Sequence, residues 1–440
     1  MKVYLDNAAT APIKREVRAA LLPYLGAKFG NPSSIHSWGQ AARQAVDKAR
    51  EQVARFLNCS SDEIIFTSGG TEADNLAISG MIISRDMSIQ NRRSIVPASQ
   101  SPPTRSVSSL NHATRPARVS SLDISQHFEK LPHIITTQIE HHAVLKTCED
   151  LAKTGQAEVT YIKPNREGII NPQDIEKAFK KNTVLVSIMY VNNEIGTIQP
   201  IREIGKMIEK LNRERSSVNS QRIYFHTDAV QAAEFLPMDV DFLHVDFLTI
   251  SGHKIGAPKG IGALYARKGT SLKKIIFGGE QELNLRSGTE NVAGIVALGK
   301  AVEIIGRQKT EDGRRIQKLR DYFTNRVLKE ISGVELNGSK EFRIPNNANF
   351  YFKYIEGESI LLNLDLVGIA ASSGSACTSL SLQPSHVLMA CFNEAERAHG
   401  SVRFTLGEGT SKEEIDYTIK NLKTIVRRLR AMSPLTERKR

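Results

Sequence analysis

The sequence predicts an α/β protein in which a large domain with a mostly parallel sheet is followed by a smaller α+β domain. Two observations lead to this prediction: short apolar runs rich in β-branched residues alternate with helical stretches up to residue 251, and the alternation stops after residue 268. Strands separated by helices and buried on both faces are typical of a parallel sheet. We expect strands at residues 63–67, 133–137, 184–191, 223–227 and 247–251.

The helices follow from apolar spacing. Between Ser37 and Leu57 apolar residues recur every three or four positions, with a serine as N-cap. Towards the C-terminus we expect a long helix over 291–331, strands at 347–352 and 402–407, and a last helix at 412–432. The domain boundaries that we predict are 13–263 for the large domain and 264–440 for the small one, with residues 1–12 packing on the small domain.

Residues 84–130 are rich in Ser, Pro and Arg and show no sustained periodicity. We interpret them as a disordered surface insertion. The alternative is a docking arm for a partner.

The formal net charge is +12. Residues 84–130 hold seven Lys or Arg against three Asp or Glu, and residues 427–440 hold six against one. The rest of the chain is therefore only mildly basic, and direct nucleic-acid binding is not expected as a main function. No apolar run is long enough to cross a bilayer, and the first residues resemble neither a signal peptide nor a transit segment, so we expect a cytoplasmic protein without membrane contact.

The four cysteines are scattered, and no two form a CxxC pair, which argues against a disulfide framework or a zinc site. Cys377 stands apart because Ser, Gly and Thr surround it in ASSGSACTSLS, as in an accessible loop. It is the candidate nucleophile. Cys59, Cys148 and Cys391 have the neighbours of packing residues.

Three strand ends carry residues suited to one cofactor. TSGGTEADNL opens a helix after a strand, so backbone N–H groups near Gly70 and Thr71 can face a phosphate, although taken alone such a motif is more often a plain turn. HTDAVQ places Asp228 at a strand end, and the next strand ends in SGHK with Lys254. A lysine for a Schiff base, a carboxylate for the pyridine nitrogen and a phosphate cradle match pyridoxal phosphate.

Two more residues belong to this hypothesis. His141, in the run EHH after the strand 133–137, can stack on the ring and transfer protons, or be an ordinary satisfied histidine. Adjacent histidines without a third ligand make a poor metal site. Arg403, in SVRFTLG, can hold an amino-acid carboxylate through two hydrogen bonds, and its alternative is a structural salt bridge.

With these motifs, the chain resembles the cysteine desulfurases, in the class-V aminotransferase group of fold type I pyridoxal-phosphate enzymes. The similarity covers nearly the whole chain except residues 84–130. The motifs that carry it stand in family order: LDNAAT, FGNPSS, TSGGTEADN, EHHAV, VNNEIG, HTDAVQ, SGHKIGAPKGIGALY, LRSGTEN, SSGSACTS and SVRFTLG. The SSGSAC form resembles the NifS/IscS branch rather than the branch with an RxGHHCA loop.

The resemblance implies roles for single residues. The phosphate would be held by Gly70, Thr71, Ser251 and His253, and by Thr289 of the neighbouring subunit in a homodimer. The ring would be contacted by Asn193, Asp228, Gln231 and His141, with Lys254 as the Schiff-base residue. The substrate would be bound by Arg403, which would hold its carboxylate, and by Asn193.

The activity implied by the resemblance is conversion of L-cysteine to L-alanine, with sulfur passing to Cys377 as a persulfide. From there it would go to an acceptor protein, such as an iron–sulfur scaffold or a tRNA-thiolation enzyme, and Cys377 would be a transient iron–sulfur ligand. Other possibilities are an aminotransferase or selenocysteine lyase of the same fold group, and a sulfur-relay or tRNA-associated binding protein without catalysis.

Overall fold

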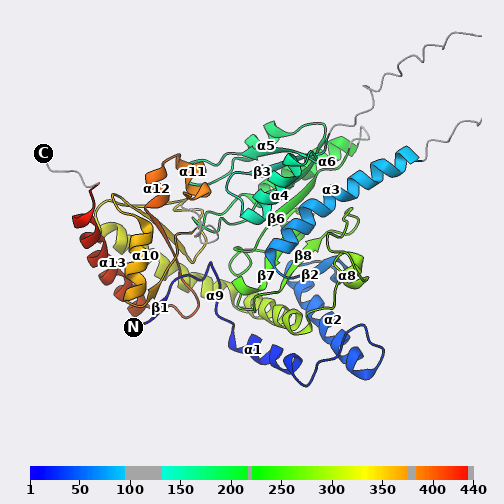
Figure 1. The fold of residues 1–440 in the computed structure, drawn as a ribbon, viewed down its shortest axis with the longest axis horizontal. Helices are drawn as coiled ribbons and strands as arrows, with labels where there is room; N and C mark the ends of the chain where they lie inside the picture. Colours follow the sequence, from blue (N-terminus) through cyan, green and yellow to red (C-terminus); the bar gives the residue numbers. More distant parts are fainter. Residues whose placement is uncertain (95–130, 217–220, 375–382, 435–440) are drawn as a thin grey trace, which may run out of the picture.

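The computed structural model describes residues 1–94, 131–216, 221–374 and 383–434. A seven-stranded sheet forms its centre, in the order β2-β8-β7-β6-β5-β3-β4 (Figure 1). Neighbours are parallel from β7 through β6, β5 and β3 to β4, whereas β8 runs antiparallel to both β2 and β7. The strands are β2 (Ile64–Thr67), β3 (His133–Thr137), β4 (Glu158–Ile162), β5 (Thr183–Ser187), β6 (Tyr224–Asp228), β7 (Phe247–Ser251) and β8 (Gly262–Ala266).

Helices cover both faces of this sheet because successive strand residues point to opposite sides. Ile135 and Phe66 belong to the core beneath α2, α6 and the first half of α9, whereas Ile134 and Ile65 face α3 and α4. The strands are apolar on both faces for this reason, as the sequence predicted. The helices of this part are α1 (Arg15–Leu21), α2 (Ser37–Leu57), α3 (Gly70–Ser94), α4 (His142–Lys153), α5 (Pro172–Ala178), α6 (Ile201–Ser216), α7 (Val240–Leu243) and α8 (Gln281–Asn284).

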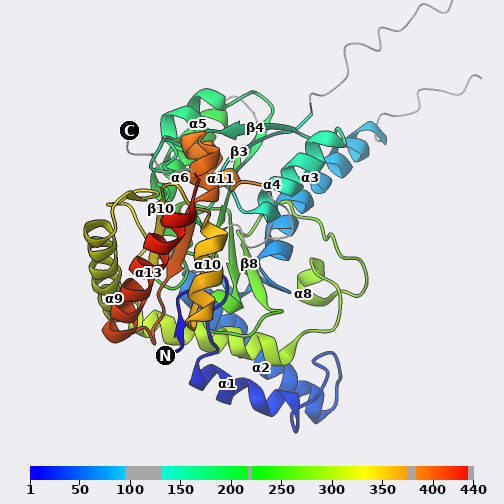
Figure 2. The same cartoon turned by 60° about the vertical axis from the view of Figure 1, so that its left-hand side comes forward.

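A second core lies around a three-stranded antiparallel sheet, in the order β12-β10-β9. The rings of Phe323, Phe350 and Phe404 meet edge-on or tilted in this core, and α10 and α13 lie side by side over it (Figure 2). Its elements are β9 (Val334–Leu336), β10 (Asn347–Phe352), α10 (Gly357–Leu366), β11 (Ile369–Ala370), α11 (His386–Phe392), α12 (Ala395–His399), β12 (Ser401–Thr405) and α13 (Lys412–Met432).

Helix α9 connects the cores, whereas the N-terminal strand packs on the smaller one. The 39-residue helix α9 (Val292–Glu330) contributes Leu298 to the large core and Phe323 to the small one. The N-terminal strand β1 (Val3–Tyr4) pairs in parallel with β11. Because α9 serves both cores, the boundary expected at residue 264 stays a prediction.

Most predicted elements are present, and several details differ. The strand expected at 184–191 ends at Ser187, and β8 was not among the expected strands. Helix α3 continues through Ser94, so residues 84–94 of the expected insertion are helical; the remaining 95–130 lie outside the described residues. The side chain that caps α2 is His36, whose Nδ1 accepts from the Gly39 N–H over 3.3 Å, because Ser37 is already helical. Strand β4 was missed because its exposed and half-buried residues do not form a continuous apolar run.

Among the described helices, none combines the length and apolar character needed to cross a membrane.

Candidate active site

A cavity of about 300 Å³ opens at the carboxyl ends of the parallel strands. It lies there because β6 ends at Asp228, β7 ends at Ser251 and the turn after β3 carries His141, and this edge of a parallel sheet is where ligand sites form. Ten residues predicted from the sequence line it together: Gly70, Thr71, His141, Asn193, Asp228, Gln231, Ser251, His253, Lys254 and Arg403.

Lys254 enters the cavity from the 3-10 turn Gly252–Lys254 that follows β7. Its Nζ donates to the carbonyl oxygens of Ala8 and Ala9 at 2.5 and 2.8 Å. The N-terminal segment therefore fixes the amine in the cavity through backbone carbonyl oxygens. This contact does not depend on the side chains at positions 8 and 9.

Asp228 lines the cavity together with Asp74 of α3. Both carboxyl groups are buried, and Oδ1 of Asp228 accepts from the Val230 N–H at 2.9 Å. Burial raises the pKa of Asp228 to about 7, with a smaller contribution from Asp74, whose own pKa burial raises to about 8. A buried carboxylate is stable only beside a positive charge or several hydrogen-bond donors.

His141 is the N-cap of α4, and its Nδ1 accepts from the Ala143 N–H at 3.1 Å. This hydrogen bond leaves the proton of the neutral ring on Nε2. Burial, and after it the charge of Lys254, lowers the pKa of His141 to about 4. The ring is therefore neutral at physiological pH and presents a flat apolar face with one N–H donor.

The amino terminus of α3 forms the anion-binding end of the cavity. Gly70 begins this 25-residue helix, so its first N–H groups have no partner within the helix. Gly69, just before it, has a φ of 155°, in the region that favours glycine. A Cβ on Gly262 of β8 would lie 2.8 Å from the backbone of Gly69, so the close approach of strand and turn requires glycine there.

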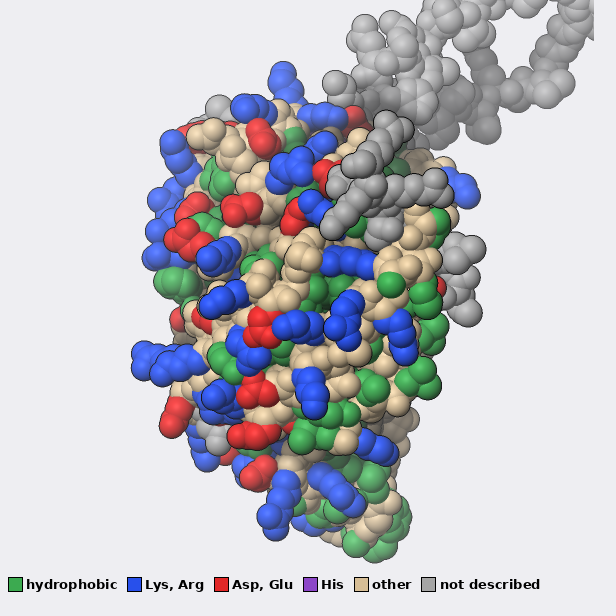
Figure 3. Space-filling model, turned by 90° about the vertical axis from the view of Figure 1, so that its left-hand side faces the viewer, with side chains coloured by type: hydrophobic (Ala, Val, Ile, Leu, Met, Phe, Trp, Pro, Cys, Tyr) green, Lys and Arg blue, Asp and Glu red, His purple; other side chains and the backbone are tan. Residues whose placement is uncertain are grey.

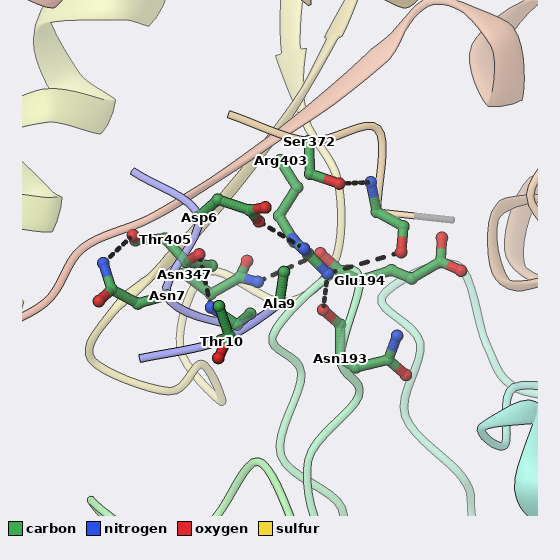
Figure 4. Close-up of polar contacts among 12 residues, drawn as sticks. Asp6, Asn7, Ala9, Thr10, Asn193, Glu194, Asn347, Ser372, Arg403 and Thr405 are labelled. Carbon is green, nitrogen blue, oxygen red and sulfur yellow. Dashed lines mark hydrogen bonds and ion pairs between the residues drawn. The ribbon is translucent and has the colours of Figure 1, made fainter. Parts of the chain in front are cut away.

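Arg403 also lines the cavity, and its contacts join the N-terminal segment to Asn193 (Figure 4). Its Nη2 donates to Oδ1 of Asp6 at 2.8 Å, and its Nη1 donates to the carbonyl oxygen of Asn193 at 2.8 Å. The salt bridge that the sequence left as an alternative is thus present. The Nε of Arg403 is also buried, but among the described residues it has no acceptor. The Nε–H is thus a donor that the contacts of the described residues do not use.

One predicted site residue does not line this cavity, and another lies outside the described residues. Thr289 is exposed and does not line the cavity of its own chain, and its role towards a neighbouring subunit stays a prediction. Cys377 lies outside the described residues. Of the cysteines predicted to pack, Cys148 and Cys391 are buried and Cys59 is half-buried. Within the described part of the chain, no cluster of His, Cys, Asp or Glu could hold a metal.

Sequence reasoning missed several residues at this site. Asp6, Ala8 and Ala9 belong to the LDNAAT motif, which was noticed only as part of the resemblance. Asp74 lies four residues after Gly70, one helical turn further along α3, and this spacing was the signal that could have placed it in the cavity.

The residues present fit pyridoxal phosphate. The helix amino terminus offers unpaired N–H groups to a phosphate, and a cavity of this volume suits a small cofactor. Asp228, buried and facing the cavity, needs a positively charged neighbour, which a protonated pyridine nitrogen supplies. Lys254 provides the amine for covalent attachment.

Comparisons with known proteins agree with this geometry. The family Aminotransferase class-V matches residues 3–99 and 111–418. "Cysteine desulfurase IscS" of Dictyoglomus turgidum is 47% identical over 98% of this chain and 96% of its own, and "Cysteine desulfurase IscS" of Methanosarcina thermophila is 44% identical over 99% and 94%. A solved structure titled "NIFS-LIKE PROTEIN" superposes with a TM-score of 0.80 at 31% identity, covering 98% of this chain and all of the other.

Fold and site together define a pyridoxal-phosphate-dependent enzyme of the class-V aminotransferase family. Within that family the chain belongs to the cysteine desulfurases, in the branch that contains IscS and the NifS-like proteins. The fold and the cofactor expected from the sequence are thereby confirmed.

Proposed function

We propose that this enzyme converts L-cysteine to L-alanine and passes the sulfur, through a persulfide on Cys377, to an acceptor protein. The observation that carries the proposal is that the amine of Lys254, the carboxyl of Asp228, the ring of His141 and the guanidinium of Arg403 line one cavity. The first three groups follow or end separate strands of the large sheet, Arg403 lies within β12, and together they have the chemistry needed to act on the α-carbon of an amino acid.

When bound, pyridoxal phosphate supplies an electron sink for charge that develops at the α-carbon of the substrate. In our proposal Gly70, Thr71, Ser251 and His253 hold its phosphate. Asp228 faces the ring nitrogen, while Asn193 and Gln231 face the ring oxygen. The Nε2 of Gln231 already donates to the carbonyl oxygen of Ala8 over 3.1 Å, which fixes the direction of its side chain.

Arg403 orients the substrate. Its Nε, buried and without an acceptor among the described residues, can donate to the carboxylate of cysteine. Because Asp6 and the carbonyl of Asn193 already hold the two terminal nitrogens, the guanidinium is fixed before substrate arrives. Lys254 then removes the α-proton as the general base, and the neutral ring of His141, which would stack on the cofactor, holds a proton at Nε2.

Cys377 accepts the sulfur. Its thiolate attacks the sulfur atom of the substrate, so that a new S–S bond forms while the C–S bond breaks. The electron pair of the C–S bond stays on the carbon fragment, which is protonated and released as alanine. The persulfide on Cys377 then carries the sulfur to iron–sulfur assembly or tRNA thiolation, and Cys377 acts as a transient iron–sulfur ligand there.

The experiment that tests this function is incubation of the enzyme with L-cysteine, followed by intact-mass analysis and an alanine assay. We expect alanine together with an added sulfur atom, mapped to Cys377 by peptide analysis. Absence of both products would contradict the proposed activity. Release of alanine without a sulfur adduct would be consistent with the proposed activity but would exclude Cys377 as the sulfur carrier.

We further propose that the enzyme is a homodimer. Large apolar side chains are exposed along residues 22–38: Leu22, Leu25, Phe29, Ile35 and Trp38. The rings of Phe29 and Trp38 stack edge-on at 4.6 Å and line a shallow pocket, yet each is more than half exposed. A surface this apolar is typical of a protein–protein interface. We propose that a second copy of the chain covers it, because a dimer would also bring Thr289 to the cofactor phosphate of the neighbouring subunit.

The charge distribution supports a protein rather than a nucleic acid as sulfur acceptor. On the face shown in Figure 3, Asp and Glu side chains are interspersed among the Lys and Arg side chains over much of the surface. Such a mixed surface suits transient protein contacts more than a phosphate backbone. We place the reaction in the cytoplasm.

A further inference from the structure

We propose that Glu194 is a positioning residue that joins the two ends of the segment bearing Cys377 and ties them to the cofactor cavity. This inference rests on the proposed role of Cys377. It depends on contacts made by the described residues on either side of that segment, Gly374 before it and Ser385 after it.

Glu194 follows Asn193, a predicted contact of the cofactor ring, and is only 2% exposed. Its backbone is held on several sides. The N–H of Glu194 donates to Oδ1 of Asn192 at 2.9 Å, and its carbonyl oxygen accepts from the side-chain amides of Asn347 and Asn349 at 3.1 and 3.0 Å. The side chain therefore projects from a rigid position between the two cores.

The first end of the segment lies against this side chain. Gly374 has a φ of 90°, and a Cβ built on it would lie 3.3 Å from both Cβ and Oε2 of Glu194. Two residues earlier, Ser372 exchanges backbone hydrogen bonds with Arg403, the proposed anchor of the substrate carboxylate. Figure 4 shows Ser372, Arg403, Asn193 and Glu194 in one group.

The second end is bonded to the same carboxyl group. The Oγ of Ser385 donates to Oε2 of Glu194 at 2.5 Å and also caps α11 by accepting from the Leu388 N–H. The next residue, His386, has its Nε2 2.9 Å from the carbonyl oxygen of Glu140, the neighbour of His141. The end of the segment is thus bonded to residues adjacent to two predicted ring contacts, Asn193 and His141.

This carboxyl group has no role in the proposed chemistry, although burying it is costly. Burial raises the pKa of Glu194, an effect that His386, Ser385 and Arg403 oppose. Because Gly374 and Ser385, on either side of residues 375–382, both contact this side chain, we infer that Glu194 influences how Cys377 reaches the substrate. Displacement of a reacting group by about 1 Å can cost on the order of 100-fold in rate.

The test separates attack by Cys377 from everything before it. In the holoenzyme, the change in cofactor absorbance on adding L-cysteine reports substrate binding, and quenched-flow mass analysis reports sulfur on Cys377. For Glu194→Ala we expect an unchanged absorbance response and a rate of persulfide formation about 10- to 100-fold lower. Glu194→Gln, which keeps an acceptor oxygen for Ser385, should recover most of that rate.

A second pair of variants distinguishes a specific effect on persulfide formation from a general loss of stability. Ser385→Ala removes the bond to Glu194 and one helix cap, whereas Ser411→Ala removes only the equivalent cap of α13, where Oγ accepts from the Glu414 N–H. Both should lower the melting temperature similarly, but only Ser385→Ala should slow persulfide formation.

Persulfide formation at the wild-type rate in Glu194→Ala or Ser385→Ala would overturn the inference. So would a parallel loss of the absorbance response, because Glu194 would then act on the cavity itself. If wild-type enzyme releases alanine without an adduct on Cys377, the failure lies instead in the proposed role of that cysteine.

Discussion

The guanidinium of Arg403 donates to the carboxylate of Asp6 over 2.8 Å, although 397 residues separate them in the chain. This ion pair joins the N-terminal segment to β12 at the edge of the cavity, and both side chains are largely buried. Asp6 orients the guanidinium and balances part of its charge. The Nε of Arg403 is buried and has no acceptor among the described residues.

Replacement of Arg403 by Lys should raise the KM for L-cysteine and lower kcat/KM about 10- to 150-fold. The ammonium of lysine cannot reproduce the planar set of donors, and a hydrogen bond to a charged group contributes about 1.5–3 kcal/mol. Steady-state alanine assays measure the change. Asp6→Asn, which keeps an acceptor oxygen, should have a smaller effect, and an unaltered KM in Arg403→Lys would show that the carboxylate binds elsewhere.

Replacement of Lys254 by Ala should abolish covalent attachment of the cofactor and lower alanine formation by at least about 100-fold, because one side chain serves as attachment point and general base. Absorbance after dialysis and an alanine assay provide the readout. Lys259→Ala is the matched control, since Lys259 is exposed and does not line the cavity. Retention of the bound-cofactor spectrum by Lys254→Ala would contradict the assignment.

Alkylation should modify Cys377 before any other cysteine. Burial raises the pKa of Cys59, Cys148 and Cys391 to about 12, so their reactive thiolate forms are scarce at pH 8. A short treatment with iodoacetamide followed by peptide mass mapping shows the order in which the four cysteines are alkylated. Cys377→Ser should remain largely unmodified while still binding the cofactor; equal labelling of Cys59 in the wild type would disagree with this prediction.

Asp74→Asn should flatten the pH dependence of stability of the cofactor-free protein between pH 6.5 and 8. Burial raises the pKa of Asp74 to about 8, so the folded state keeps a proton that the unfolded chain has released. Wild-type stability therefore falls as pH rises through this window, whereas asparagine has no such proton. Melting temperatures of both proteins at pH 6.5 and pH 8 test the sign. The melting temperature of the variant relative to the wild type should be higher at pH 8 than at pH 6.5.

Trp38→Glu should produce a monomer. Trp38 is 57% exposed beside Phe29 in the apolar surface proposed as the dimer interface, and a buried unpaired carboxylate there would oppose association. Light scattering after size exclusion measures the mass, with Leu366→Glu on exposed α10 as the control. Weaker cofactor retention by the monomer would support the proposed contact of Thr289 with the cofactor phosphate of the neighbouring subunit. A monomeric wild-type protein would exclude the dimer.

Local sequence patterns predicted much of the fold. The last helix begins and ends at Lys412 and Met432 as expected, and β3 and β7 match the predicted strands residue for residue. Helical spacing and continuous apolar runs are local properties, so periodicity alone reveals them. Strand β4 and the helical course of residues 84–94 escaped this reasoning because neither shows such a pattern.

The sequence by itself determined the chemical groups of the site, since strand ends carry Asp228, Lys254 and His141 in recognisable motifs. Only the tertiary structure decided how they are held. The backbone of Ala8 and Ala9 binds the amine of Lys254, Asp74 faces Asp228, and Glu194 lies between Gly374 and Ser385. Those contacts join residues far apart in the chain, and no local pattern encodes them, because the chain must fold before buried carboxyl and amine groups find their partners.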